Sequence, residues 1–290
     1  SAKRWLVLGP VNFQPSEVTK FTIVIYFAYR IEKKTEEMDS FKGGILTYLL
    51  LLAPYAGLIL IQPHISGFIL ICTIAASLVV CGGANKWQII TILVVGVAAL
   101  AWFINWQANI EGSYVAVRMK SWLTPFDDVL NDTWQTSHSL IAIGSGGLFG
   151  LGFGNSRQKY LYLPEAQNDF IFPIVCEELG FVGAFAIILV FFLLVVEGYS
   201  IAARCQDKFG MLIAVGFTTH IGIQSILNLA VVSNTIPNTG ISLPFFSYGG
   251  TALIMQMAEM GIILNISRKR YYPEEDDEKA VPKARLKKRA

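Results

Sequence analysis

Charged side chains are scarce in this sequence. Only 15% of the 290 residues are Asp, Glu, Lys or Arg, whereas 53% are hydrophobic and the mean hydropathy is +0.51. Soluble globular domains contain about 25% charged residues. The composition therefore excludes an ordinary soluble domain and indicates a membrane protein.

Cysteine is also rare. The four cysteines lie in or beside apolar stretches, with no C-x-x-C spacing, and are Cys72, Cys81, Cys176 and Cys205. This distribution argues against disulfides and a cysteine-based metal site, and it favours buried thiols in a core. The sequence does not begin with methionine, and we expect an upstream part to be absent.

Long apolar runs dominate what is present. A membrane-spanning helix needs roughly 20 mostly apolar residues, and several segments reach that length, whereas the short alternating segments of a barrel are missing. Gly, Pro and charged residues separate the runs, as expected at helix ends. The sequence therefore predicts an all-α, polytopic transmembrane helical bundle with seven spans, at about 17–31, 45–62, 66–83, 87–106, 179–200, 210–232 and 249–267.

Lysine and arginine are unevenly distributed between the connections. Most of them fall in four segments, which are 32–44, 84–87, 201–209 and the tail from 268. Because cytoplasmic connections carry the excess of basic residues, we place these segments in the cytoplasm, and we place 107–178 and 233–248 outside. The membrane-embedded domain is expected to cover 1–267. The polar tail, 268–290, is expected to be disordered.

The external segment 107–178 is the one long connection, and loops of this length are usually functional or disordered. It contains Trp122 and Trp134, and a glycine-rich stretch, GSGGLFGLGFG, covers 144–154. Six glycines make the apolar stretch from 139 to 154 a poor continuous span. Irregular backbone at membrane depth is tolerated where it is buried in protein or lines a wet cavity. We therefore expect a re-entrant or interfacial element here.

Four carboxylates stand at the end of this segment, in YLPEAQNDFIFPIVCEELG (162–180), directly before an uncharged run. Acids in this position fit a helix N-terminus, where they complement the helix dipole, or a functional site. Asp169 differs from the others because three apolar residues, 170–172, follow it, and partial desolvation makes a carboxylate a better base. With Lys159 and Arg157 nearby, the pattern suggests an anionic, lipid-linked substrate.

Three long blocks resemble the SEDS family (shape, elongation, division and sporulation), which includes the FtsW, RodA and SpoVE proteins. They occur in the family's order and are RWLVLGPVNFQPSEVTK (4–20), the stretch from SLIAIGSGG to EELGFVG (139–183), and PNTGISLPFFSYGGTALI (237–254). The resemblance covers about residues 3 to 268. It implies a fold of ten transmembrane helices, of which the seven spans here are the fourth to the tenth.

The resemblance also implies an activity. Family members are peptidoglycan glycosyltransferases that polymerise lipid II at the outer face of the bacterial cytoplasmic membrane, in cell division, cell shape or sporulation. The aspartate of the family's DFIF motif is essential for polymerisation and corresponds to Asp169, which we expect to act as general base. The expected partners are a class B penicillin-binding protein and other divisome or elongasome membrane proteins, without nucleic acid. No cofactor is implied with certainty, and a divalent cation stays an open alternative.

Other candidate residues come from the external segment and the matching blocks, and the alternative for each cation is an interfacial, snorkelling side chain. The candidates for binding the anionic substrate are Lys159, Arg118, Lys120, Glu165 and Arg157. For Glu177 and Glu178 we expect a structural role at the start of the next helix. Residues 247–250 either shape the cavity or pack at a helix start. In the first block, Glu17 and Lys20 are spaced to pair on one helix face.

One departure stands out, because QPHISG places His64 where the family usually has an acid. Two other functions compete with polymerisation. A lipid II flippase would need a path across the bilayer but no catalytic base. A seven-helix retinal-type protein fits the span count, but the last span has no lysine for a Schiff base, and the long loop falls in the wrong place.

Overall fold

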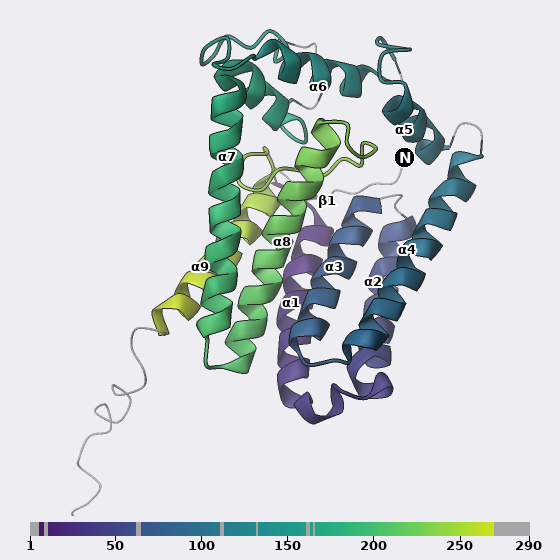
Figure 1. Cartoon of the computed structure of the whole chain (residues 1–290), viewed down its shortest axis with the longest axis vertical. Coiled ribbons are helices and arrows are strands. Elements are labelled where there is room, and N and C mark those ends of the chain that lie inside the picture. Colours follow the sequence, from purple (N-terminus) through teal and green to yellow (C-terminus); the bar gives the residue numbers. More distant parts are fainter. Residues whose placement is uncertain are drawn as a thin grey trace, which may run out of the picture.

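The computed structural model describes residues 6–8, 11–61, 65–110, 113–131, 133–160, 163–164 and 166–269. The described chain is almost entirely helical, which confirms the predicted fold class (Figure 1). The exception is a short antiparallel ribbon of β1 (Leu6–Leu8) and β2 (Val11–Phe13), which leads into the first helix. The tail from 270 onwards, Glu165 and His64 lie outside the described residues.

All seven predicted spans coincide with helices. These are α1 (Pro15–Lys33), α2 (Thr47–Ile61), α3 (Ile65–Cys81), α4 (Lys86–Ala108), α7 (Ile171–Arg204), α8 (Lys208–Val232) and α9 (Gly250–Lys269). Five described helical stretches are long and apolar enough to cross a membrane, namely α4, α7, α8, α9 and α2 with the π-helical turn Phe41–Leu46 before it. Helix α3 is apolar but shorter, and α1 carries charges near its first turn.

Helix α8 forms the centre of the bundle, between α7 on one side and α1 and α3 on the other (Figure 1). It is apolar on all sides apart from a few polar residues, as expected for a fully surrounded helix. Small residues allow close packing: a Cβ at Gly216 would lie 2.6 Å from Val24 of α1, and one at Gly198 of α7 would lie 2.3 Å from Thr218. Asp207 begins α8 by accepting a hydrogen bond from the Gly210 amide at 2.8 Å.

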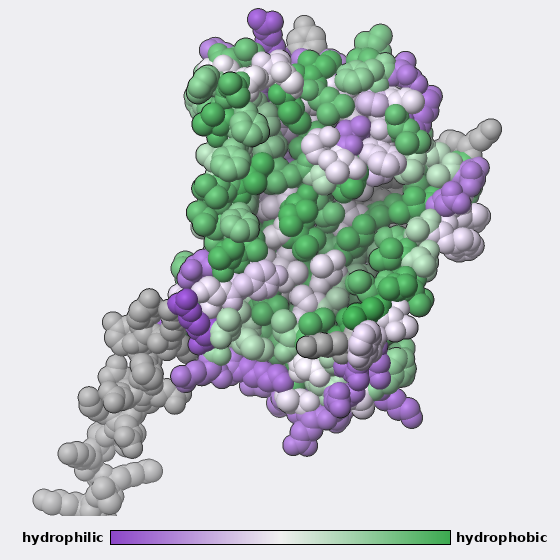
Figure 2. Space-filling view, viewed as in Figure 1, coloured by the Kyte–Doolittle hydropathy of each residue, from purple (hydrophilic) through white to green (hydrophobic). Residues whose placement is uncertain are grey.

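Hydrophobic residues cover the middle of the molecular surface, whereas hydrophilic residues gather at its ends (Figure 2). Helix α4 at the edge of the bundle buries none of its apolar window, and the outward side chains of α7 are largely exposed. Exposing this apolar surface to water would cost free energy, whereas the acyl chains of a bilayer can cover it. The surface therefore agrees with a bundle embedded in a membrane.

The segment between α4 and α7 contains two further helices, α5 (Tyr114–Leu123) and α6 (Trp134–Ser145), which lie across one end of the bundle (Figure 1). The glycine-rich stretch after α6 packs against α7. The amides of Leu151 and Gly152 donate to the carbonyl groups of Glu177 and Glu178 at 2.9 and 3.0 Å. The contact needs glycine at 150, because its φ is +78° and a Cβ there would lie 2.1 Å from the Glu178 carbonyl oxygen.

Helix α7 begins at Ile171, eight residues before the predicted start at 179. It is kinked at Gly180, where φ is +66° and ψ is −167°. The amides of Phe181 and Val182, just beyond the kink, donate to Gly147 and Leu148 of the glycine-rich stretch. Two helical segments therefore meet at Gly180, next to the predicted start at 179. The shorter segment, 171–179, carries the two glutamates and is held by hydrogen bonds from 156–159.

Candidate functional site

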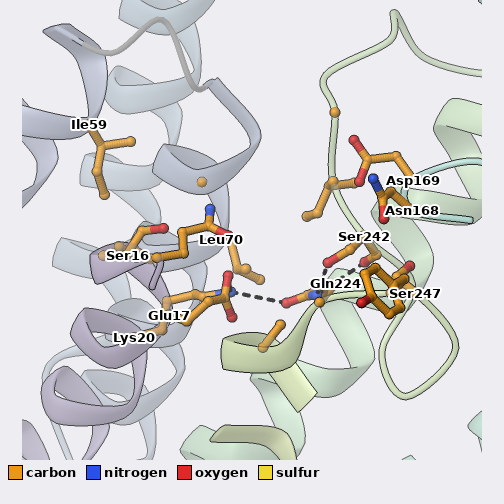
Figure 3. Close-up of a pocket in the computed structure, with 18 residues that line it drawn as sticks. Ser16, Glu17, Lys20, Ile59, Leu70, Asn168, Asp169, Gln224, Ser242 and Ser247 are labelled. Carbon is orange, nitrogen blue, oxygen red and sulfur yellow. Dashed lines mark hydrogen bonds and ion pairs between the residues drawn. The ribbon is translucent and has the colours of Figure 1, made fainter. Parts of the chain in front are cut away.

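A cavity of about 290 Å³ opens between α1 and the chain segments that pack on α8 (Figure 3). Its wall comes from regions far apart in the sequence. Helices α1, α2, α3 and α8 contribute to it, and so do the residues just before α7 and the loop between α8 and α9. Asp169 lies on this wall beside Asn168. Apolar side chains such as Leu70 and Ile71 of α3 line the same space. The site therefore offers both polar and apolar surface to a ligand.

A side chain of α8, Asn228, holds the backbone around Asp169 in place. The Asn228 side-chain amide donates to the Asp169 carbonyl oxygen at 2.8 Å and to the Ile241 carbonyl oxygen at 2.7 Å. Asn228 is completely buried, and the adjacent Phe170 packs in a small apolar cluster with Leu163 and Leu243. These contacts fix the residue while leaving its half-buried side chain on the cavity wall. Its partly apolar surroundings agree with the sequence prediction.

The opposite wall carries a buried ion pair. Lys20 Nζ lies 2.8 Å from Glu17 Oε1, and both side chains are more than 90% buried. The pairing predicted from the (i, i+3) spacing is thus confirmed. The same ammonium donates to Gln224 Oε1 of α8 at 3.2 Å. Figure 3 shows Glu17 and Lys20 across the cavity from Asp169, so an acid from the segment before α7 and a cation from α1 face one space.

Of the other predicted site residues, the four that the structure describes do not line this cavity. Arg118 of α5 donates to Gln135 of α6 at 3.0 Å, and Lys120 and Arg157 are exposed. Lys159 Nζ lies 2.8 Å from Glu178 Oε1 and also donates to the Gly154 carbonyl oxygen. The hydrogen bond to Glu178 raises the pKa of Lys159, so its ammonium is committed to the loop. Glu165 lies outside the described residues.

Glu177 and Glu178 hold the external loop in place. The Ser156 hydroxyl and the Gln158 amide donate to Glu177 Oε2, and the Arg157 amide donates to Glu177 Oε1 at 3.1 Å. Glu178 receives the Ser156 amide and the Lys159 ammonium. Both residues are largely buried. This arrangement agrees with the structural role expected for the pair.

Replacing Ser156 with alanine is expected to destabilise the protein by about 1–3 kcal/mol, because a buried carboxylate loses a charge-assisted donor. Thermal unfolding in detergent measures the loss. Ser267→Ala is the matched control, since the Ser267 hydroxyl donates to its own helix at Leu264 and is only partly buried. Equal stability of Ser156→Ala and the control would show that the carboxylate does not depend on this hydroxyl.

Sequence reasoning did not assign three polar residues of the cavity to the site. Lys20 was matched only to a family block, while Gln224 and Ser242 were not singled out. The available signal was a lysine just before the mostly apolar run 21–29 of α1 and a long amide among the mainly apolar residues of α8. Residues 247–249, for which cavity shaping was one alternative, do line the cavity. In the described part of the chain, no group of three or more His, Cys, Asp or Glu residues could hold a metal ion.

Comparison with protein families gives a match over nearly the whole chain. The model of the FtsW/RodA/SpoVE family, described as "Cell cycle protein", matches residues 1–272. A probable peptidoglycan glycosyltransferase FtsW from Trichlorobacter lovleyi is 39% identical over 92% of this chain and 68% of its own length. The stage V sporulation protein E of Bacillus subtilis is 37% identical over 92% of this chain and 72% of its own length.

Solved structures show the same architecture. One chain of a peptidoglycan synthase complex, described for its coordination of polymerization and crosslinking, superposes with a TM-score of 0.72. It is 29% identical, and the match covers 93% of this chain and 74% of that one. The rod shape determining protein RodA of Thermus thermophilus gives a TM-score of 0.64 at 28% identity, over 93% of this chain and 70% of that one.

Proposed function

Because this chain belongs to the FtsW/RodA/SpoVE family of cell cycle proteins, we propose that it polymerises lipid II with Asp169 as general base. The chain is a multi-pass protein of the cytoplasmic membrane and a peptidoglycan glycosyltransferase, as its named relatives and its apolar helices indicate. The observation that carries the proposal is the cavity in which Asp169 faces the Lys20 ammonium.

The reaction forms one bond and breaks another at C1 of the donor MurNAc. Asp169 takes the proton from the 4-hydroxyl of the acceptor GlcNAc as that oxygen attacks C1 with inversion. The bond from C1 to the pyrophosphate oxygen breaks, and undecaprenyl pyrophosphate leaves with the electron pair. Nucleophile and leaving group stand on opposite sides of C1 in such a displacement. A base on one wall and a cation on the other match this requirement.

Lys20 is the cation that this geometry favours for the leaving group, in place of the loop cations expected from the sequence. Its ammonium lies on the cavity wall, and positive charge near a departing pyrophosphate stabilises the negative charge that develops there. The apolar lining residues of α3 offer a surface for the first carbons of an isoprenoid chain. The loop cations Arg118 and Lys159 instead hold elements together.

A class B penicillin-binding protein is the proposed partner. The supporting observation is the superposition on a chain of a peptidoglycan synthase complex that coordinates polymerization with crosslinking. With the basic segments in the cytoplasm, the cavity, α5 and α6 lie at the external face. Both enzymes would then work on the same side of the membrane, where glycan strands are made and cross-linked.

A polymerisation assay in detergent, combined with a transport assay in proteoliposomes, distinguishes polymerisation from flipping. The full-length protein with its cognate penicillin-binding protein is incubated with labelled lipid II in detergent, where no transport is possible. We expect glycan strands that muramidase digests to disaccharide units. Absence of strands, together with lipid II movement across proteoliposomes, would instead favour the flippase.

A further inference from the structure

A second buried polar group lies deeper in the bundle, behind the cavity. His220 of α8 and Glu259 of α9 are 1% and 0% exposed, and His220 Nδ1 lies 2.9 Å from both carboxylate oxygens of Glu259. Neither residue lines the cavity. Ionisable side chains inside a membrane bundle are costly and mark functional sites by default. A buried ion pair also adds little stability by itself.

The pair is connected to the cavity through Gln224. His220 Nε2 lies 2.9 Å from Gln224 Oε1, and the same oxygen accepts from Lys20 Nζ at 3.2 Å. The Gln224 amide nitrogen donates to the carbonyl and hydroxyl oxygens of Ser242 at 3.1 and 3.2 Å. One amide thus joins α1, α8 and the loop after α8. It is itself only 1% exposed.

The hydrogen-bond partners of Gln224 determine which ring nitrogen of His220 must carry a hydrogen. A flipped Gln224 amide would turn its oxygen toward the Ser242 carbonyl and its nitrogen toward an ammonium that only donates. The oxygen therefore faces His220, and His220 Nε2 must carry a hydrogen. With Nε2 protonated, the contact between Nδ1 and Glu259 needs one more proton, on either the imidazole or the carboxyl group. The pair consequently holds one shared proton and is neutral overall.

We propose that His220 and Glu259 are positioning residues for polymerisation, which hold Gln224 in the orientation that receives the Lys20 ammonium at the cavity. This inference rests on the proposed function of the cavity. Loss of the shared proton would favour the Nδ1–H tautomer of His220, because Glu259 would then be an anion. The bare Nε2 would face the oxygen of Gln224, and the amide would lose its anchor.

Few other charged groups reach this network. Helix α1 contributes Glu17 and Lys20, and α9 contributes Glu259. Helix α3 carries no charged residue. In α7, Glu197 and Arg204 are exposed, while Glu177 and Glu178 bond the 156–159 segment. In α6, His138 bonds Gln158. Among the described helices packed on α8, Lys20 and His220 are the ionisable residues that contact Gln224 directly.

Glu259→Gln removes the shared proton of the pair but keeps the shape of the side chain at 259. A glutamine can donate to Nδ1 while His220 keeps its Nε2 hydrogen, so the hydrogen-bond chain and its neutral charge persist without a titrating proton. The Glu259→Gln variant should therefore keep near wild-type kcat. Glu259→Leu, which removes the partner of His220 Nδ1, should lower kcat about tenfold, the effect of about one lost hydrogen bond.

Two further variants complete the kinetic test. His220→Leu removes both contacts and should lower kcat about tenfold with little change in KM. Tyr199→Phe is the control, because it removes a hydroxyl bonded at 2.8 Å to Thr219, next to His220, and leaves the network intact. Its kcat should match the wild type. If Glu259→Leu and His220→Leu were as active as this control, the proposal would be overturned.

A readout without turnover distinguishes this proposal from the proposed function. Nitrogen-15 histidine NMR of the full-length protein in nanodiscs, with His220→Gln to assign the signal, should show Nε2 of His220 protonated at neutral pH. An unprotonated Nε2 overturns the positioning role even if the wild type polymerises lipid II. A protonated Nε2 in a protein that makes no polymer would instead count against the proposed function alone.

Discussion

Replacing Asp169 with asparagine should lower the rate of lipid II polymerisation by about 10²–10⁴-fold, which is the typical contribution of general-base catalysis. Asparagine keeps the shape of the side chain and can still form hydrogen bonds, but it cannot take a proton. The backbone carbonyl oxygen that accepts from Asn228 is unchanged by the substitution. The fold and the binding of the penicillin-binding protein should therefore persist. The rate is measured as glycan strands formed by the purified complex.

Asp128→Asn is the matched control for this experiment. Asp128 is also an acid of the external segment, but it lies in the turn between α5 and α6, where its Oδ1 accepts from Asn131 at 3.0 Å. It does not line the cavity. Its variant should polymerise lipid II at close to the wild-type rate. If Asp169→Asn were as active as this control, the general-base assignment would be wrong, and the acids of 162–180 would be structural residues.

The fold could be predicted from the sequence because its determinants are local. Most spans are mainly apolar runs closed by Gly, Pro or charge, so hydropathy alone locates them to within a few residues. The short helical segment 171–179, before the kink at Gly180, was not predicted. It contains Glu177 and Glu178, and their burial depends on donors some 20 residues earlier in the chain, at 156–159. No local pattern reports such a contact.

The candidate site was less predictable because its partners are far apart in the sequence. Asp169 stood out because of the apolar residues that follow it directly in the sequence. Lys20 and Gln224, however, meet across 204 residues, and only the packing of α1 on α8 brings them together. The loop cations looked suitable because they lie in the same external segment as Asp169, and Lys159 lies only ten residues before it. Lys159 nevertheless reaches Glu178, and Arg118 reaches Gln135.

Lys20→Met should both destabilise the protein and abolish most of its activity. Removing one partner of a buried ion pair leaves a buried charge uncompensated, which costs about 3–5 kcal/mol. Here the same change also removes the cation from the cavity wall. Lys34→Met is the control, because Lys34 and Glu37 form a pair with the same 2.8 Å separation just after α1, but both side chains are about half exposed. Exposed pairs contribute about 0–1 kcal/mol, so this variant should be nearly as stable as the wild type.

The double variant Glu17→Gln/Lys20→Met separates the structural from the catalytic contribution of the pair. It removes both charges together, so no buried charge is left alone, and thermal unfolding in detergent should recover most of the stability lost in Lys20→Met. Polymerisation should stay low, because the cavity still lacks a cation for the departing pyrophosphate. Recovery of the polymerisation rate along with stability would show that the pair only supports the fold, and the cation that stabilises the leaving group would then have to come from elsewhere in the chain or from its partner.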